Sequence, residues 1–179
     1  MQVPARNRVT AAAAAAAIAA AGVTVTTAAA RETKPAALPT RAELVPGRSL
    51  GGVRLGMTPT QVRSLWGKRF GVCRNCAQRT WYFTYRAFQP QGAAVSFRGG
   101  RVDAIWTLWS PEGWRTGDGS LRLGADDSRV TAVVGPAVTI PCGSYTALLR
   151  TRRVTTVYYL FGGKLWAFGL MRSEATPCR

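Results

Sequence analysis

Two stretches of the chain share one pattern of apolar and polar positions, LGMTPTQVRSLWG at residues 55–67 and LGADDSRVTAVVG at residues 123–135. In the first stretch the apolar side chains of Val62, Leu65 and Trp66 recur at the spacing of one helical face. The second stretch repeats this spacing with three valines. Each stretch therefore predicts a short amphipathic helix, and the recurrence indicates an internal duplication.

The ends of both helices are marked by residues that cap helices. Thr58 and Gln61 have the spacing of a capping box, in which each side chain covers a free backbone amide of the first turn. Asp126 takes the N-cap position in the second copy. Gly67 and Gly135 follow the last apolar residue of each helix, where a left-handed residue ends it.

Strands are predicted after each helix. Residues 81–88 and 145–150 are rich in aromatic and β-branched side chains. A Gly-Gly pair follows in each copy, at residues 99–100 and 162–163, and such pairs favour tight hairpin turns. The prediction is an α+β fold of two tandem units, each with a short helix packed on a three-stranded antiparallel sheet.

The hairpin register assigns each strand residue to the face under the helix or to the opposite face. The helix side is predicted to hold Val95, Phe97, Val102, Ala104, Trp106, Leu108, Tyr158, Leu160, Leu165 and Ala167. The opposite side is predicted to hold Ser96, Arg98, Arg101, Asp103, Ile105, Trp109, Tyr159, Phe161, Lys164, Trp166 and Phe168. One short helix cannot cover both faces, so the second face is either open or packed against its twin.

The chain divides into five segments by composition. Residues 1–30 read as a signal peptide, because two early arginines precede a long uncharged run that ends in small residues; an uncleaved membrane anchor is the alternative. Residues 31–49 contain three prolines and read as a flexible tether. Two α+β repeats follow at 50–110 and 118–179, joined by a connector at 111–117. The chain is therefore predicted to be secreted or extracytoplasmic.

Four cysteines in an exported chain indicate disulfides. Three pairings are open, and we favour one bridge per copy, Cys73 with Cys76 and Cys142 with Cys178. The CRNC motif of the first pair is not followed by the apolar helix that would activate a redox thiol.

The residue types argue against catalysis. The sequence has no histidine, and its eight Asp and Glu residues are scattered. No nucleophile has a visible base beside it. We therefore predict a protein that is not an enzyme and has no cofactor or metal.

The formal net charge of +16 favours anionic partners. Motifs that bind nucleic acid are missing from the sequence, so acidic envelope polymers are the expected polyanions. The candidate residues for such contacts are Arg150, Arg152 and Arg153; a solvated charge cluster is the alternative.

The helix motif resembles that of the β-lactamase inhibitor protein family, whose wider relatives include the small SmpA/OmlA envelope lipoproteins. The matching residues are Leu55, Gly56, Met57, Thr58, Gln61, Val62, Gly67 and Cys73 in the first copy, and Leu123, Gly124, Val130, Gly135 and Cys142 in the second. The resemblance implies an exported bacterial protein with tandem α/β units, whose sheets form a concave aromatic face that grips another protein.

Together these patterns predict an exported module that binds another protein, in the manner of an inhibitor, through an open sheet face. The candidate binding residues are Arg98, Arg101, Trp109, Tyr159, Lys164, Trp166 and Phe168. Tyr, Trp and Arg are the types that dominate binding hot spots. Two alternatives remain open: the aromatic side chains pack as an ordinary second core, or the protein is attached electrostatically to anionic wall or lipid polymers.

Overall fold

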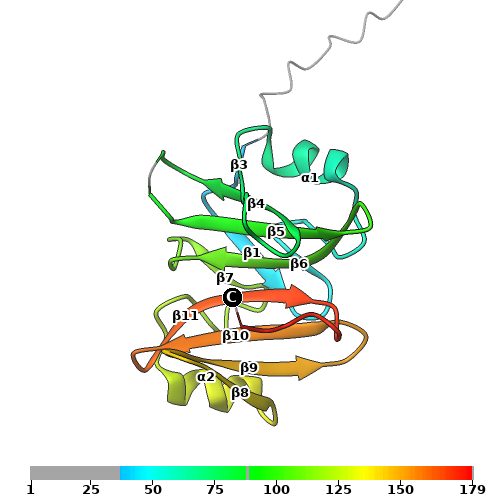
Figure 1. Ribbon diagram of the computed structural model, residues 1–179. Coiled ribbons are helices and arrows are strands. Elements are labelled where there is room, and N and C mark those ends of the chain that lie inside the picture. Colours follow the sequence, from blue (N-terminus) through cyan, green and yellow to red (C-terminus); the bar gives the residue numbers. More distant parts are fainter. Residues whose placement is uncertain (1–36, 88, 179) are drawn as a thin grey trace, which may run out of the picture. The chain divides into compact units, whose positions relative to one another are not determined.

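The computed structural model describes residues 37–87 and 89–178 as an α+β fold with two helices and two sheets (Figure 1). The predicted signal peptide and the first part of the predicted tether lie outside these residues. The helices are α1 (Pro59–Trp66) and α2 (Asp127–Val134). The strands are β1 (Ala42–Val45), β2 (Ser49–Leu50), β3 (Gly71–Val72), β4 (Arg79–Thr84), β5 (Gly92–Arg98), β6 (Arg101–Leu108), β7 (Trp114–Thr116), β8 (Val138–Cys142), β9 (Tyr145–Thr151), β10 (Thr155–Phe161) and β11 (Lys164–Met171).

The larger sheet is antiparallel and has eight strands in the order β3-β4-β5-β6-β11-β10-β9-β8. Its two halves meet where β6 pairs with β11, with Trp106 opposite Gly169 and Ile105 opposite Leu170. A Cβ atom on Gly169 would lie 2.2 Å from the carbonyl oxygen of Ile105. The seam between the halves therefore needs a glycine at position 169.

The prediction of two equal tandem units is wrong. Each half does contain a helix followed by four strands, but these strands join in one continuous sheet. Pairing β6 with β11 removes two edges that separate units would leave with unpaired backbone groups. A second sheet, in the order β2-β1-β7, has no counterpart in the other half.

This smaller sheet includes residues that the sequence placed in linkers. β1 pairs antiparallel with β2 and parallel with β7. Leu44 and Leu50 are fully buried, and so is Trp114 of the predicted connector. Residues 42–49 are thus part of the fold, because alternate side chains of this short segment reach the core despite the prolines around it.

The helix ends follow the sequence prediction in α1 but only in part in α2. Thr58 accepts a hydrogen bond from the amide of Gln61 at 3.3 Å, and the Gln61 side chain accepts one from the Thr58 amide at 2.8 Å. Asp126 takes the N-cap position of α2, but its side chain makes no capping hydrogen bond. Its carboxylate pairs instead with Lys164, at 2.5 Å.

Both Gly-Gly hairpins close as predicted, but each then contains a bulge. Arg98 pairs with Arg101 and Phe97 with Val102, whereas Ser96 pairs with Ala104, which leaves Asp103 as the extra residue. In the second hairpin the shift between Tyr159 and Leu160 makes Trp166 the extra residue. A shift of one residue moves every later side chain to the other face.

The bulges change the predicted faces. Ile105 and Phe168 join the core under the helices, in one cluster with Val95, Phe97, Val102, Tyr158 and Leu165. Ala104, Trp106 and Ala167 move to the opposite face, where they pack with Ala94, Ala147, Val157, Tyr159, Met171 and Ala175.

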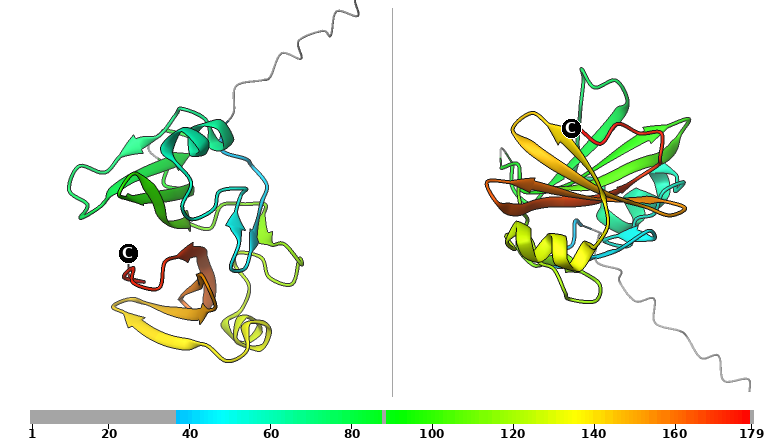
Figure 2. Two further views of the ribbon diagram at one scale, coloured as in Figure 1. Left: turned by 90° about the vertical axis from the view of Figure 1, so that its right-hand side faces the viewer. Right: turned by 90° about the horizontal axis from the view of Figure 1, so that it is seen from below.

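The chain after β11 covers part of this second face. Figures 1 and 2 show it on the side of the large sheet opposite to the helices and the small sheet. Ala175 is buried there, and Cys178 forms a disulfide with Cys142 of β8. The second face is therefore partly closed by the molecule's own C-terminal segment.

Candidate protein-binding surface

The surface begins where β6 ends and the chain turns away from the sheet. Trp109 follows β6, and its ring packs edge-on against the ring of Trp166 in β11, with 6.0 Å between centroids. The hydroxyl of Ser110 donates a 2.7 Å hydrogen bond to the backbone carbonyl of Trp166. These two contacts hold the end of β6 against β11.

Trp109 and Ser110 have an unusual backbone conformation. Their φ angles are +51° and +47°, and no other non-glycine residue of the described chain has a positive φ. Non-glycine residues in the left-handed region cost about 1 to 3 kcal/mol each, and they concentrate at functional sites. Trp109 is nevertheless 56% exposed. The strained backbone thus carries an aromatic residue that is largely exposed.

Two further aromatic rings, those of Tyr145 and Tyr159, support Trp109 through its contact with Trp166. The Tyr145 and Tyr159 rings lie 6.0 and 6.5 Å from the Trp166 ring, and 5.8 Å from each other. Tyr159 is buried, and its hydroxyl donates a 2.9 Å hydrogen bond to the carbonyl of Pro177. We call Trp109, Tyr145, Tyr159 and Trp166 the aromatic cluster. It has a buried base at Tyr159 and an exposed tip at Trp109.

The structure brings together three of the predicted binding residues, Trp109, Tyr159 and Trp166. Phe168 is not among them, because the bulge at Trp166 turns its side chain into the helix-side core, where it is fully buried. Tyr145 belongs to the cluster but was not predicted. The signal for it is weak: Tyr145 starts a predicted strand, and only the pairing of β9 with β10, which puts Ala147 opposite Tyr159, places it beside Tyr159.

The predicted basic residues lie elsewhere. Arg98 and Arg101 are at the opposite end of β6 from Trp109, about 25 Å along an extended strand of eight residues. Arg98 is 3.6 Å from the buried carboxylate of Asp103, which Arg172 approaches at the same distance. Lys164 pairs with Asp126. The predicted binding residues therefore do not form one face: the aromatic group is separate from Arg98 beside Asp103 and from Lys164 beside Asp126.

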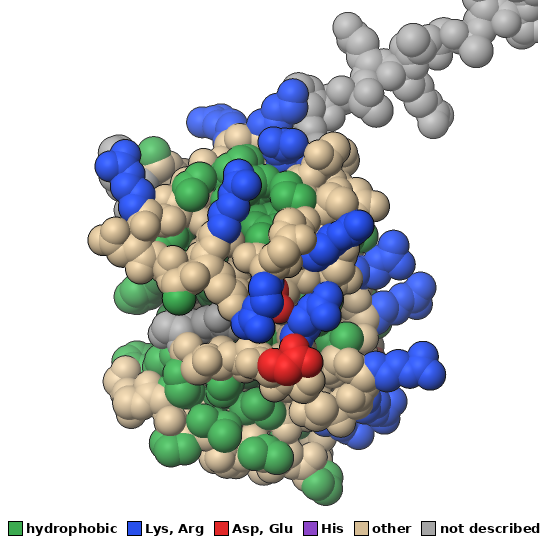
Figure 3. Space-filling view, turned by 45° about the vertical axis from the view of Figure 1, so that its right-hand side comes forward, with side chains coloured by type: hydrophobic (Ala, Val, Ile, Leu, Met, Phe, Trp, Pro, Cys, Tyr) green, Lys and Arg blue, Asp and Glu red, His purple; other side chains and the backbone are tan. Residues whose placement is uncertain are grey.

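The predicted polyanion residues differ in their contacts, although Arg150 and Arg152 line one small cavity. Arg150 donates a 3.0 Å hydrogen bond to the carbonyl of Val134, so it caps the end of α2. Arg152 and Arg153 are exposed in the loop between β9 and β10. Lys and Arg side chains are crowded along one edge of the view in Figure 3, whereas hydrophobic side chains gather in other parts of that face.

Both disulfides pair as predicted from the sequence. Cys73 and Cys76 close a small loop between β3 and β4. Cys142 and Cys178 join β8 to the C-terminal segment across 36 residues. The second bridge is close to a contact of the aromatic cluster. Cys178 directly follows Pro177, whose carbonyl accepts the hydrogen bond from the Tyr159 hydroxyl. It therefore helps to fix the base of the cluster.

The described residues contain no group of three His, Cys, Asp or Glu side chains that could hold a metal ion. Neither helix in this part of the chain is long and apolar enough to cross a membrane.

Comparisons with known proteins assign no family. No protein-family model matches the chain, and no curated protein matches it in sequence. Among solved structures it is similar to an extracellular protein containing a SCP domain from Bacillus anthracis str. Ames, at 12% identity and a TM-score of 0.48. The match covers 67% of this chain and 44% of that protein. A similarity this distant indicates neither family nor function, and the resemblance to the β-lactamase inhibitor family stays a prediction.

Proposed function

We propose that this protein is an exported binding module that recognises another protein through the aromatic cluster, with Trp109 as the anchor. The observation that carries the proposal is the exposed indole of Trp109, held in a strained backbone conformation by Ser110 and Trp166. The module is not an enzyme.

The energetics of Trp109 favour recognition over packing. A residue in the core repays backbone strain by burying its side chain, but more than half of this indole faces solvent. Burying the exposed part against a partner, on the order of 100 Å², would contribute about 2.5 kcal/mol. A rigid support also lowers the entropy lost on binding, since the side chain is already ordered.

The alternative of an ordinary second core accounts for only part of the cluster. Tyr159 is buried and bonded to the C-terminal segment, as a core residue would be. Trp109 is not. We therefore assign Tyr159 a supporting role and place the contact with the partner at Trp109 and the outer side of Trp166.

Export is supported by the two disulfides. Such bridges form and persist in oxidising compartments and are rare in the cytosol. The partner is thus expected among secreted or envelope proteins.

Electrostatic attachment to anionic envelope polymers is the second candidate. It is favoured by the net charge and by Arg152 and Arg153, which are exposed and belong to none of the ion pairs of the described residues. Polymer attachment should weaken steeply between low and moderate salt. Binding through Trp109 should change little.

The proposal is tested by affinity capture from envelope and secreted extracts with three baits, the wild type, Trp109→Ser and Phe161→Ser. Phe161 is a matched control, because it is an aromatic residue that is 51% exposed and lies outside the cluster. We expect one dominant protein with the wild type and with Phe161→Ser, and its loss with Trp109→Ser. Equal capture by all three baits would remove Trp109 from the interface.

A further inference from the structure

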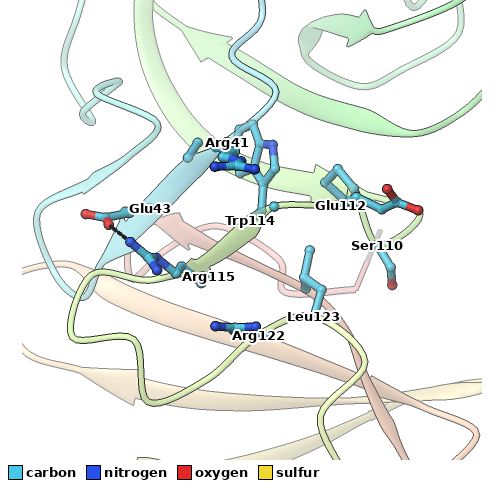
Figure 4. A pocket seen from close by; sticks show the side chains of 11 residues that line it. Arg41, Glu43, Ser110, Glu112, Trp114, Arg115, Arg122 and Leu123 are labelled. Atoms are coloured by element: carbon cyan, nitrogen blue, oxygen red, sulfur yellow. Dashed lines mark hydrogen bonds and ion pairs between the residues drawn. The ribbon is translucent and has the colours of Figure 1, made fainter.

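An open cavity of about 700 Å³ lies at the small sheet and extends to Ser110, the neighbour of Trp109 in the aromatic cluster (Figure 4). Its floor is formed by β1 and β7, where the exposed Glu43 and Arg115 lie beside the buried Ala42 and Trp114, and its wall by the loop after β6. The volume is within the range of about 300 to 1,000 Å³ that is typical of small-molecule sites.

A row of charged residues crosses the floor on three neighbouring segments. Glu43 of β1 is the register partner of Arg115 of β7, and their side chains form an ion pair at 3.1 Å. Arg115 is in turn bridged to Arg122 on its other side. Arg115 and Arg122 thus lie directly opposite each other, with the single carboxylate of Glu43 on the far side of Arg115, and like charges in this arrangement repel.

A third arginine reaches the same cavity because of a glycine. Arg41 lies two residues before Glu43 and lines the cavity. Gly113 approaches it so closely that a Cβ atom would lie 2.9 Å from Cγ of Arg41 and 2.8 Å from the carbonyl oxygen of Thr40. The φ angle of Gly113 is +78°, which also favours glycine. Residue 113 therefore has to be a glycine for this wall to form.

Two of the three guanidinium groups are left without a counter-charge. The described residues form four ion pairs, and neither Arg41 nor Arg122 belongs to any of them. Glu112 also lines the cavity and is likewise in none of these pairs; its carboxylate is directed away from Arg41 and Arg122 in Figure 4. Arg115 is neutralised by Glu43. The cavity is thus lined by three arginines and two carboxylates, and the guanidinium groups of Arg41 and Arg122 are outside its one ion pair.

We propose that this cavity binds a doubly charged anionic group, a phosphate monoester or a dicarboxylate, carried by a molecule larger than the anion. Arg41 and Arg122 hold the two negative charges, because guanidinium groups bind such oxygens in a bidentate, charge-assisted manner. Leu123 and Ala42 contact the rest of the molecule. The proposal does not rest on the proposed protein-binding function, although Ser110 contributes to both sites.

The test is to titrate the full-length protein, with both disulfides formed, with anionic probes at constant ionic strength. Binding is monitored by calorimetry and by the NMR signals of the Gly113 amide and the Arg122 guanidinium. The probes are inorganic phosphate, glucose 6-phosphate and succinate, with acetate and glucose as controls. We expect a doubly charged probe to bind and to shift both signals, acetate to bind at least about tenfold more weakly, and glucose not to bind. Preference for glucose 6-phosphate over succinate would identify the ligand as a phosphate ester, and the reverse preference as a dicarboxylate.

Arg122→Gln separates a built site from general attraction to a basic protein. It should weaken binding of the doubly charged probe by about tenfold or more. The matched control Arg152→Gln removes an equal charge outside the cavity and should leave the affinity unchanged. A similar loss of affinity in both variants would overturn the proposal. So would NMR shifts that follow ionic strength alone, or a failure of every doubly charged probe to bind.

Discussion

The hydroxyl of Ser110 donates a hydrogen bond to the backbone carbonyl of Trp166, at 2.7 Å, and so joins the strained end of β6 to the bulged residue of β11. This hydrogen bond links the bulge at Trp166 to the left-handed backbone at Ser110. Trp166 is displaced from the ladder by the bulge, which leaves its carbonyl available to Ser110. The bond in turn holds Trp109 and Ser110 in the left-handed region.

Two substitutions at Ser110 should distinguish the contribution of this hydrogen bond to stability from the cost of the backbone strain. Ser110→Ala loses the bond and keeps the strain, so it should lower the free energy of unfolding by about 1 kcal/mol. Ser110→Gly loses the same bond but adopts a positive φ without cost, which offsets the loss. Urea denaturation of both variants measures the difference. A larger loss for glycine than for alanine would mean that the left-handed backbone is not strained.

Gly169 should be sensitive to substitution, because it lies at the seam between the two halves of the large sheet. Gly169→Ala places a methyl group 2.2 Å from the Ile105 carbonyl oxygen, so β6 and β11 must move apart. We expect a loss of about 2 to 4 kcal/mol in the free energy of unfolding. Gly71→Ala is the control, because a Cβ atom there meets no other atom within 4 Å. It should change stability little, and a similar loss at both positions would argue against the tight seam.

The two disulfides should differ in their contribution to stability. Replacing Cys142 and Cys178 with alanine opens a loop of 36 residues in the unfolded chain and should cost about 4 kcal/mol. The bridge between Cys73 and Cys76 closes a loop a tenth as long and should contribute about 2 kcal/mol. Thermal unfolding of the two double variants gives the comparison. An equal effect would indicate that the C-terminal segment adds little order.

Asp118 should make stability depend on pH in the acid range. Hydrogen bonds from the Thr116 hydroxyl, and from the amide and hydroxyl of Ser120, lower the pKa of this carboxyl from 3.8 to about 2. The charged form is favoured in the folded state, so its contribution is present above pH 3.8 and is lost as the pH falls toward 2. Asp118→Asn should flatten this part of the stability curve, as followed by denaturation at several pH values. An unchanged slope would contradict the assignment.

Local signals in the sequence predicted the helices, the hairpin turns and the disulfides. The capping box of Thr58 and Gln61 and the Gly-Gly turns act within a few residues, so they can be recognised without knowledge of the fold. The bulges could not be predicted, because they depend on pairing between distant strands, and they moved Phe168 from the predicted surface into the core. The joining of the halves through Gly169 was hidden for the same reason.

The candidate site was predicted in part. The hairpin register assigns Trp109, Tyr159 and Trp166 to one face, as residue types enriched in binding hot spots, and the structure does place them together. Arg98 and Arg101 were grouped with them because a face assignment takes no account of distance along a strand. The sequence does not indicate the cavity around Arg122, because Arg41 and Arg115 lie in segments that are predicted to be a tether and a connector.

The claim that Trp109 is a binding anchor is tested most directly by comparing affinity and stability in one variant. Once the partner has been captured, its dissociation constant for wild type and for Trp109→Ser is measured by calorimetry, beside the free energy of unfolding of each. We predict a loss of affinity of at least about tenfold, since about 2.5 kcal/mol of burial is removed, and a change in stability below about 1 kcal/mol. Unchanged affinity together with a clear loss of stability would contradict the account and make Trp109 part of the core.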